Sequence, residues 1–328
     1  MNHFTAFFYL RNMLRLFNDN KPYVLFVLPF LLAGFYTYHF MVEGSGVSHP
    51  ISMGLWGRLS LSEAVLPWWI GLGFLVHLVL IISLNFIFNE ANFYERNNYL
   101  PSLLSMTLMV SIQGYFGFNA LHLAFLGLLL CCHQMLKLDQ NIRAEKYLFN
   151  AAFFYSLSVS FFPALIFGIP ILYVLSFIFR PFSLREFIVF LLGPLVVFIY
   201  VVAYRAYFQY GGFWQDVQMT HRPFDAPPGA YILWALLGFI LLLIFYTLSV
   251  KWNGYSNRTR KELQLLLGML IGISACVTVN IPFTIGLLAM PISMIFTLSF
   301  LDKRIRSASS LLYYGLLVFI VVKFLLKT

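Results

Sequence analysis

Charged residues are scarce in this sequence. Asp, Glu, Lys and Arg make up 10% of its 328 residues, whereas a soluble globular chain carries about 25%. Hydrophobic residues make up 61%, so too little polar surface remains to keep a globule of this size in solution. The composition therefore excludes an ordinary soluble protein and predicts one whose solvent is lipid.

Several sequence signals of chemistry are also absent. The chain has no Walker motif, no HExxH, no GxSxG and no multi-histidine cluster of the kind that a membrane di-iron oxygenase needs. Its three cysteines lie in apolar runs without metal-ligand spacing, so we predict no metal site from them. No predicted membrane segment has a carboxylate near its middle, which argues against ion-coupled transport.

The feature that is present throughout is the apolar run. We predict an all-α, polytopic integral membrane protein with about eleven membrane segments. These are expected near 23–41, 67–88, 99–116, 119–136, 148–179 (two segments), 187–207, 230–250, 263–279, 282–300 and 308–325.

The run 148–179 is too long for one ordinary span of about 20 residues. Pro163, Gly168 and Pro170 interrupt it. We favour two short segments that turn near Pro163, because this keeps Arg180 and Arg185 on the more basic side. A single kinked span is the alternative.

Lysine and arginine are sorted unequally by these segments. Sixteen of the 21 fall on the side of the N-terminus, and the other five are Arg58, Arg205, Arg222, Lys323 and Lys327. This positive-inside pattern predicts an inner membrane protein with a cytoplasmic N-terminus and a periplasmic C-terminus. The net charge of +9 is dispersed over helix ends, so we predict contact with anionic lipid and no nucleic-acid partner.

These predicted segments leave only short stretches of the chain outside the membrane. Residues 1–22 are expected to form a cytoplasmic amphipathic segment, and 23–328 a single membrane domain. Two external loops are expected at 42–66 and 208–229, the first with a short interfacial helix around 56–65. A basic internal loop is expected at 251–262.

The external loops hold the candidate site residues. Glu43 is the candidate base or ligand of a divalent cation, and Arg205 and Arg222 are candidate phosphate ligands, with His221 and Asp216 beside them. The alternative is that these are solvated loop residues and that Arg205 extends to the membrane interface. His77, His122 and His133, with Asn85 and Gln134, are expected to form hydrogen bonds between helices.

Three stretches carry a resemblance. They are 97–104 (NNYLPSLL), 161–166 (FFPALI) and 179–186 (FRPFSLRE). With similarity over most of the chain, they resemble an uncharacterised family of polytopic inner-membrane proteins of the Bacteroidota, often labelled beta-carotene monooxygenases. The histidines that such an oxygenase would need are missing here, so the resemblance implies a location and no established activity.

The order of segments is similar to the membrane region of polyprenyl-phosphate-dependent glycosyltransferases of the GT-C class. In that class an acidic residue of the first external loop is the catalytic base or metal ligand, and the resemblance implies this role for Glu43. The usual acidic motif containing Asp is replaced here by Met41-Val42-Glu43-Gly44.

These observations favour a protein of cell-envelope assembly on a GT-C-like scaffold. It would handle a polyprenyl-phosphate-linked intermediate, as a glycosyltransferase-like enzyme or as a non-catalytic partner in an envelope complex. The alternatives are a purely structural subunit of a membrane protein complex and a transporter of a lipid or hydrophobic solute.

Overall fold

The structure is a computed structural model. It describes residues 14, 17–18, 21–43, 51–59, 65–94, 96–111, 116–138, 144–181, 183–208, 228–277, 281–302 and 304–326. This described part contains eleven α-helices: α2 (Val27–Glu43), α3 (Leu66–Glu90), α4 (Leu100–Ser111), α5 (Ala120–Leu136), α6 (Ala144–Phe161), α7 (Gly168–Ser176), α8 (Leu184–Tyr207), α10 (Pro228–Lys251), α11 (Asn257–Val277), α12 (Ile281–Leu301) and α13 (Arg306–Leu326). The predicted helical class is confirmed.

Five helical stretches are long and apolar enough to cross a membrane, by length and composition. They are Pro22–Met41, Pro67–Glu90, Leu184–Tyr207, Tyr231–Gly254 and Arg306–Lys323. Large apolar side chains on these stretches point away from the protein, for example Phe30, Leu75, Ile199, Leu242 and Val318. Lipid can solvate such surfaces, so the fold is consistent with a helical protein embedded in a membrane.

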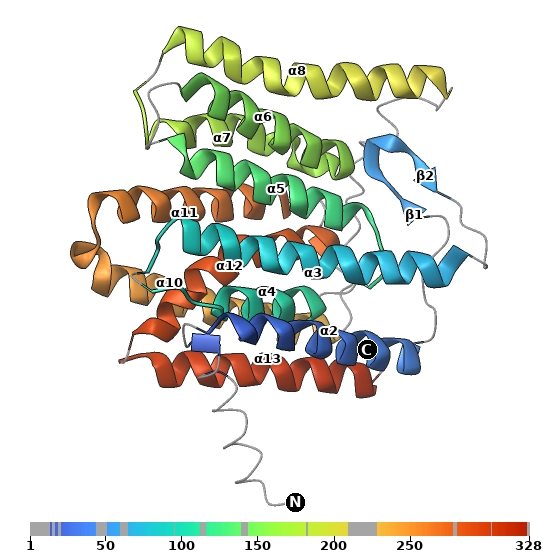
Figure 1. The fold of residues 1–328 in the computed structure, drawn as a ribbon, viewed down its shortest axis with the longest axis vertical. Helices are drawn as coiled ribbons and strands as arrows, with labels where there is room; N and C mark the ends of the chain where they lie inside the picture. Colours follow the sequence, from blue (N-terminus) through green and yellow to red (C-terminus); the bar gives the residue numbers. More distant parts are fainter. Residues whose placement is uncertain are drawn as a thin grey trace, which may run out of the picture.

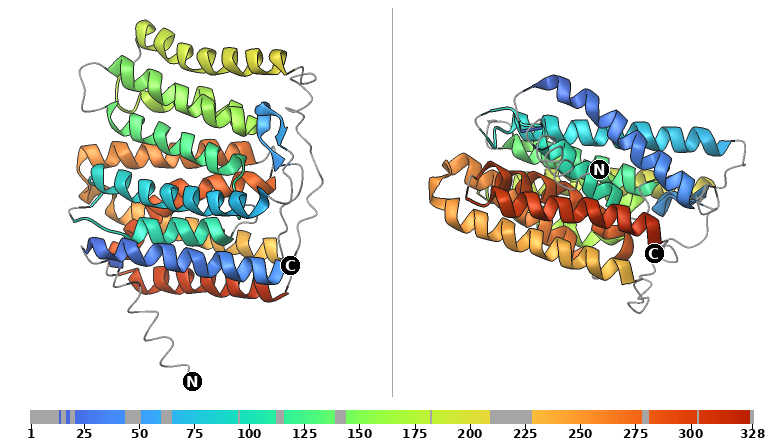
Figure 2. Two further views of the ribbon diagram at one scale, coloured as in Figure 1. Left: turned by 45° about the vertical axis from the view of Figure 1, so that its right-hand side comes forward. Right: turned by 90° about the horizontal axis from the view of Figure 1, so that it is seen from below.

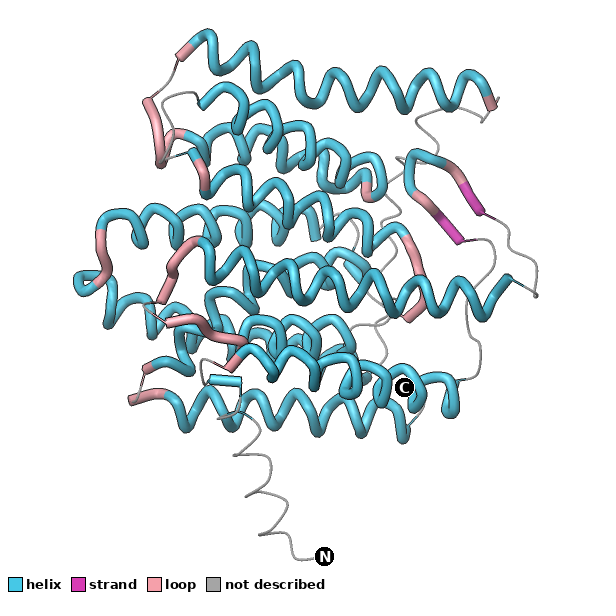
Figure 3. The backbone as a smooth tube through the Cα atoms, viewed as in Figure 1, coloured by secondary structure: helices cyan, strands magenta, loops and turns pink. Residues whose placement is uncertain are grey.

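The helices lie roughly parallel and alternate in direction, so their ends gather at two opposite edges (Figure 1, Figure 2). We call the edge where α3, α10 and α12 end the basic edge. We call the opposite edge, where α8 ends and residues 51–59 lie, the hairpin edge (Figure 3). Along the long axis, α8 lies at one end and α2 and α13 lie toward the other (Figure 1).

Small residues set the spacing of α5, α6 and α8. A Cβ on Gly193 of α8 would lie 2.7 Å from the backbone nitrogen of Phe153, and one on Gly127 of α5 would lie 2.8 Å from the carbonyl oxygen of Phe154. Both contacts are with α6. Glycine therefore allows α6 to pack closely between the other two helices, as small residues do in membrane bundles.

The chain turns at Pro163, as predicted. The hydroxyl of Tyr155 in α6 donates to the carbonyl oxygen of Leu165 at 3.0 Å, although ten residues of continuous helix would span about 15 Å. A 3-10 turn at Pro163–Phe167 leads directly into α7. Proline lacks the N–H that a continuing helix would need, which explains the break.

The predicted helix around 56–65 is wrong over its first residues. Strands β1 (Ile51–Ser52) and β2 (Arg58–Leu59) pair antiparallel across a 3-10 turn at Gly54–Trp56. Gly54 and Gly57 both have positive φ, which glycine adopts at little cost. The glycines favour this turn over a helix, and residues 60–64 lie outside the described part.

The basic loop predicted at 251–262 is also corrected. α11 begins at Asn257, and the hydroxyl of Ser256 accepts a hydrogen bond from the backbone N–H of Thr259 at 3.2 Å. Serine in this position caps a helix. Glu262 therefore lies inside α11, where it is 2% exposed, and not in a solvated loop.

Candidate functional site

The hairpin of residues 51–59 is docked on the C-terminal halves of α6 and α8. Leu55 at its tip is 1% exposed and forms a small core with Val197 and Val201 of α8. The indole N–H of Trp56 donates to the hydroxyl of Ser160 in α6 at 2.9 Å. The first predicted external loop is thus anchored to helices that follow it by about a hundred residues.

Arg205 of α8 contacts this hairpin. It lies in the last turn of α8 and is 6% exposed, and its Nη1 donates to the carbonyl oxygen of Leu55 at 3.1 Å. A hydrogen bond from a charged donor to a buried carbonyl is stronger than a neutral one. Arg205 therefore joins the first predicted external loop to the helix that leads into the second.

The other predicted site residues are not brought into contact with Arg205 by the described structure. Glu43 is the last residue of α2, and its side chain lies outside the described part, as do Asp216, His221 and Arg222. α2 and α8 lie toward opposite ends of the helix array (Figure 1). The backbone at Glu43 and the end of α8 share an edge but do not adjoin.

The predicted hydrogen bonds between helices are confirmed for some of the buried polar residues. His77 of α3 lies 3.5 Å from the hydroxyl of Tyr36 in α2, and Gln134 accepts from Asn150 of α6 at 3.5 Å. His133 lies 3.6 Å from the carboxylate of Glu90. Asn85 differs, because its buried Oδ1 has no hydrogen-bond partner within the described residues.

His122 shows a partner that the sequence analysis missed. Its Nδ1 lies 2.9 Å from Oδ1 of Asn119, which also accepts from the backbone N–H groups of Leu121 and His122. Asn119 is therefore the N-cap of α5. An asparagine immediately before an apolar run is the signal that could have identified it.

Lys323 is a second residue that the sequence analysis missed. It lies in α13, is 9% exposed, and donates from Nζ to the carbonyl oxygen of Ser111 at 3.2 Å. Ser111 ends α4, all of whose residues are buried. A cation at a helix C-terminus stabilises the exposed carbonyl groups there, and a lysine inside a terminal apolar run could have signalled this role.

Ion pairs between described residues gather at the basic edge. Lys251 lies 3.3 Å from Asp302, Arg258 lies 2.9 Å from Glu262, and Lys137 lies 3.3 Å from Glu90. Hydrogen bonding from the backbone N–H of Arg304, and then the ammonium of Lys251, hold the pKa of Asp302 below its ordinary value. The Lys251–Asp302 and Lys137–Glu90 pairs join neighbouring helix ends, whereas Arg258 and Glu262 both lie in α11.

Acid is expected to weaken the link at Asp302. Since its folded pKa is below its unfolded pKa, its contribution is complete above about pH 4 and disappears as the pH falls through the folded pKa. Asp302→Asn should cost about 0.5 kcal/mol at pH 6 and less at pH 3. Thermal unfolding between these values checks this, with Glu145→Gln as the surface control. Equal losses at both pH values would contradict the assignment.

No group of three or more His, Cys, Asp or Glu side chains that could hold a metal ion is present among the described residues. A small hollow between α6, α7 and α11 is lined by Tyr155, Leu175, Gly268 and other mainly apolar residues. The Tyr155 hydroxyl already donates to Leu165, so the lining of this hollow does not suit a polar substrate.

Comparisons of the chain with protein-family models, with curated proteins and with solved structures give no match.

Proposed function

We propose that this chain is a bacterial inner-membrane protein of cell-envelope assembly that binds a polyprenyl-phosphate-linked intermediate at its hairpin edge. In this proposal the N-terminus is cytoplasmic, and all eleven helices form the membrane domain on a GT-C-like scaffold. The hairpin edge then faces the periplasm. Its binding surface comprises the hairpin, the end of α8 and residues 208–229.

The observation that carries this proposal is the contact of Arg205 with Leu55. It holds a guanidinium and an apolar loop together at the end of a long lipid-facing helix. A guanidinium presents five N–H donors in a planar fork that matches phosphate oxygens. Arg222 and His221 in the following loop would supply further donors. The prenyl chain would pack along the apolar surface of α8.

The separation of α2 from α8 favours a non-catalytic partner over a transferase. A base and a phosphate clamp must lie within a few ångströms of one substrate. Glu43 ends α2, toward the end of the array opposite to α8 (Figure 1). A transferase using Glu43, with a divalent cation as cofactor, would require the two loops to extend toward one another across this edge.

Binding of a polyprenyl phosphate tests the proposal. We expect the purified protein to bind polyprenyl phosphate but not the corresponding polyprenol, and Arg222→Gln with His221→Gln to weaken binding by about tenfold or more, since charge-assisted bonds to phosphate are lost. Lys327→Gln is the control, because it removes a cation predicted on the same side but outside the two loops. Equal affinity for both lipids, or an unaffected double variant, would contradict the proposal.

A purely structural subunit is the second candidate. It is favoured by the exposed apolar side chains along α8, including Ile188, Leu195, Ile199 and Val202, on a helix that lies at the end of the array. This function predicts a membrane protein that co-purifies through α8 and no preference for the phosphorylated lipid. A variant Glu43→Gln would separate the transferase from both, because only catalysis requires that carboxylate.

A further inference from the structure

We propose that the basic edge contains a binding site for the headgroup of an anionic phospholipid. The site is formed by two adjoining connections: residues 251–262, from the end of α10 into the first turns of α11, and residues 302 and 304–306 between α12 and α13. We call it the basic turn cluster. It lies at the edge opposite to the proposed polyprenyl-phosphate surface and does not depend on that function.

Positive charge exceeds negative charge in this cluster. Its described residues include six cations and two carboxylates: Lys251, Arg258, Arg260, Lys261, Arg304 and Arg306 against Glu262 and Asp302. Each carboxylate is already engaged, Asp302 by Lys251 at 3.3 Å and Glu262 by Arg258 at 2.9 Å. Two carboxylates cannot offset six cations, so the described part of the cluster keeps a net positive charge. An anion is the ligand that complements this charge.

The two turns are fixed in place. The Lys251–Asp302 pair joins one turn to the other. Nη2 of Arg260 donates to the carbonyl oxygen of Asn253 at 3.0 Å, and Nε of Arg306 donates to that of Phe300 at 3.0 Å. The guanidinium groups are thus held at defined positions, which lowers the entropic cost of binding a ligand.

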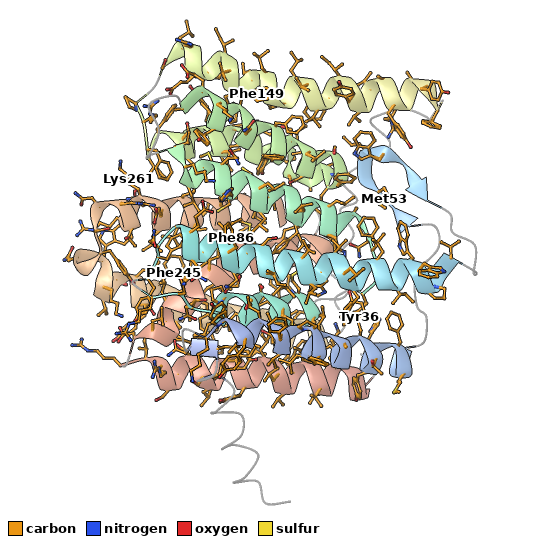
Figure 4. All side chains as sticks on the ribbon, in the orientation of Figure 1. Tyr36, Met53, Phe86, Phe149, Phe245 and Lys261 are labelled. Atoms are coloured by element: carbon orange, nitrogen blue, oxygen red, sulfur yellow. The ribbon has the colours of Figure 1, made fainter. Side chains whose placement is uncertain are left out.

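Two observations favour a ligand that is bound by the arginine N–H groups of this cluster. Arg304 and Arg306 are exposed. The Nε of Arg260 is below the surface and has no hydrogen-bond partner within the described residues. An unsatisfied donor is costly, and a phosphate oxygen at this guanidinium would reduce that cost. Lys261, labelled in Figure 4, lies on α11 at this edge.

The surface next to the cluster distinguishes a lipid from a soluble anion. α10 and α13 pack side by side (Figure 2). On α10, Leu242, Phe245 and Tyr246 are more than half exposed, and Leu311 of α13 is 71% exposed. Phe245 precedes the end of α10 by about 9 Å at 1.5 Å per residue. Acyl chains can therefore cover these side chains while the phosphate contacts the cluster, which is how basic pockets at membrane helix ends bind anionic lipids.

The experiment compares lipids that differ in headgroup charge. The full-length protein is delipidated in neutral detergent and titrated with phosphatidylglycerol, phosphatidylcholine or inorganic phosphate, and lipid adducts are counted by native mass spectrometry. We expect preferential binding of phosphatidylglycerol. Arg260→Gln with Arg304→Gln should weaken this binding by about 30-fold, because each basic residue near an anionic surface contributes about fivefold.

A matched double variant controls for loss of charge alone. Lys21→Gln with Arg185→Gln removes the same charge from other helix ends and should leave phosphatidylglycerol binding within about twofold of the wild type. The proposal is overturned if both double variants lose affinity equally, if phosphatidylcholine binds as well, or if inorganic phosphate competes at equal concentration. Retention of the native thermal midpoint in the Arg260/Arg304 variant, measured in parallel, separates loss of the site from loss of the fold.

Discussion

Replacement of Gly73 by valine should unfold the region around α3 and α5 at markedly lower temperature. A Cβ at this position would lie 2.7 Å from the Cα of Gly117, and this neighbour is backbone. Gly117 has φ +85°, and the segment that contains it is bound to α3 through the indole N–H of Trp69, which donates to the carbonyl oxygen of Phe118 at 2.6 Å. We expect a loss of about 3 kcal/mol, at the upper end for overpacking of a close contact.

Gly71 provides the matched control for this substitution. It lies two residues earlier on α3, and a Cβ there would meet no atom within 4 Å. Gly71→Val should therefore change stability by less than about 0.5 kcal/mol. The three cysteines are free and buried, so a thiol-reactive dye reports unfolding directly. Equal midpoints for the two variants would show that the α3–Gly117 contact is not tight.

Replacement of Arg258 by methionine should also destabilise the protein. Its Nε lies 2.9 Å from the carboxylate of Glu262, which is 2% exposed. The Arg258 side chain is 42% exposed, so water screens part of this pair, and we expect a loss of about 2 kcal/mol, between the values for surface and buried pairs. The double variant Arg258→Met with Glu262→Met should recover most of this loss, since both charges are then removed together.

An exposed ion pair at the same edge provides the comparison. Arg185 lies 3.4 Å from Glu145, but its side chain is 80% exposed. Arg185→Met should cost less than about 1 kcal/mol, because water and salt screen such a pair. If the variants at Arg258 and Arg185 were equally stable, burial of Glu262 would not govern the energetics of this edge.

The helices were predictable because their signals are local. Runs of apolar residues flanked by charge give the positions of α3, α8, α10 and α13 to within a few residues. Pro163 gives the turn between α6 and α7, and this turn needs no information from distant parts of the chain. The approximate count of segments follows from these signals, and membrane crossing by all of them stays a prediction.

The hairpin was not predictable by the same reasoning. Leu55 is buried against Val201, and Trp56 is partly buried with a hydrogen bond to Ser160; both partners lie more than a hundred residues away in sequence. The same is true of the bond from Arg205 to Leu55. Contacts of this range depend on how α6 and α8 pack, and composition and periodicity carry no information about that.

The candidate site was predictable only as a list of residue types. The sequence predicts Asp216, His221 and Arg222 in one polar loop and Glu43 in another, but Glu43 is the last residue of α2. The roles of all four stay predictions. The sequence does not reveal that α2 and α8 lie toward opposite ends of the array (Figure 1). Glu262 fell within the basic internal loop predicted at 251–262, whereas it lies inside α11.

The bond between Lys323 and Ser111 has a consequence for biosynthesis. Its two partners are separated by 212 positions, and α4 has 12 residues, all buried. A ribosome delivers the amino-terminal portion first, so the carbonyl at Ser111 can meet the ammonium of Lys323 only after 212 further residues have been made. Translation products that stop before α13 would lack the ammonium that binds the carbonyl of Ser111, so we expect the end of α4 to be fixed only once α13 has been made.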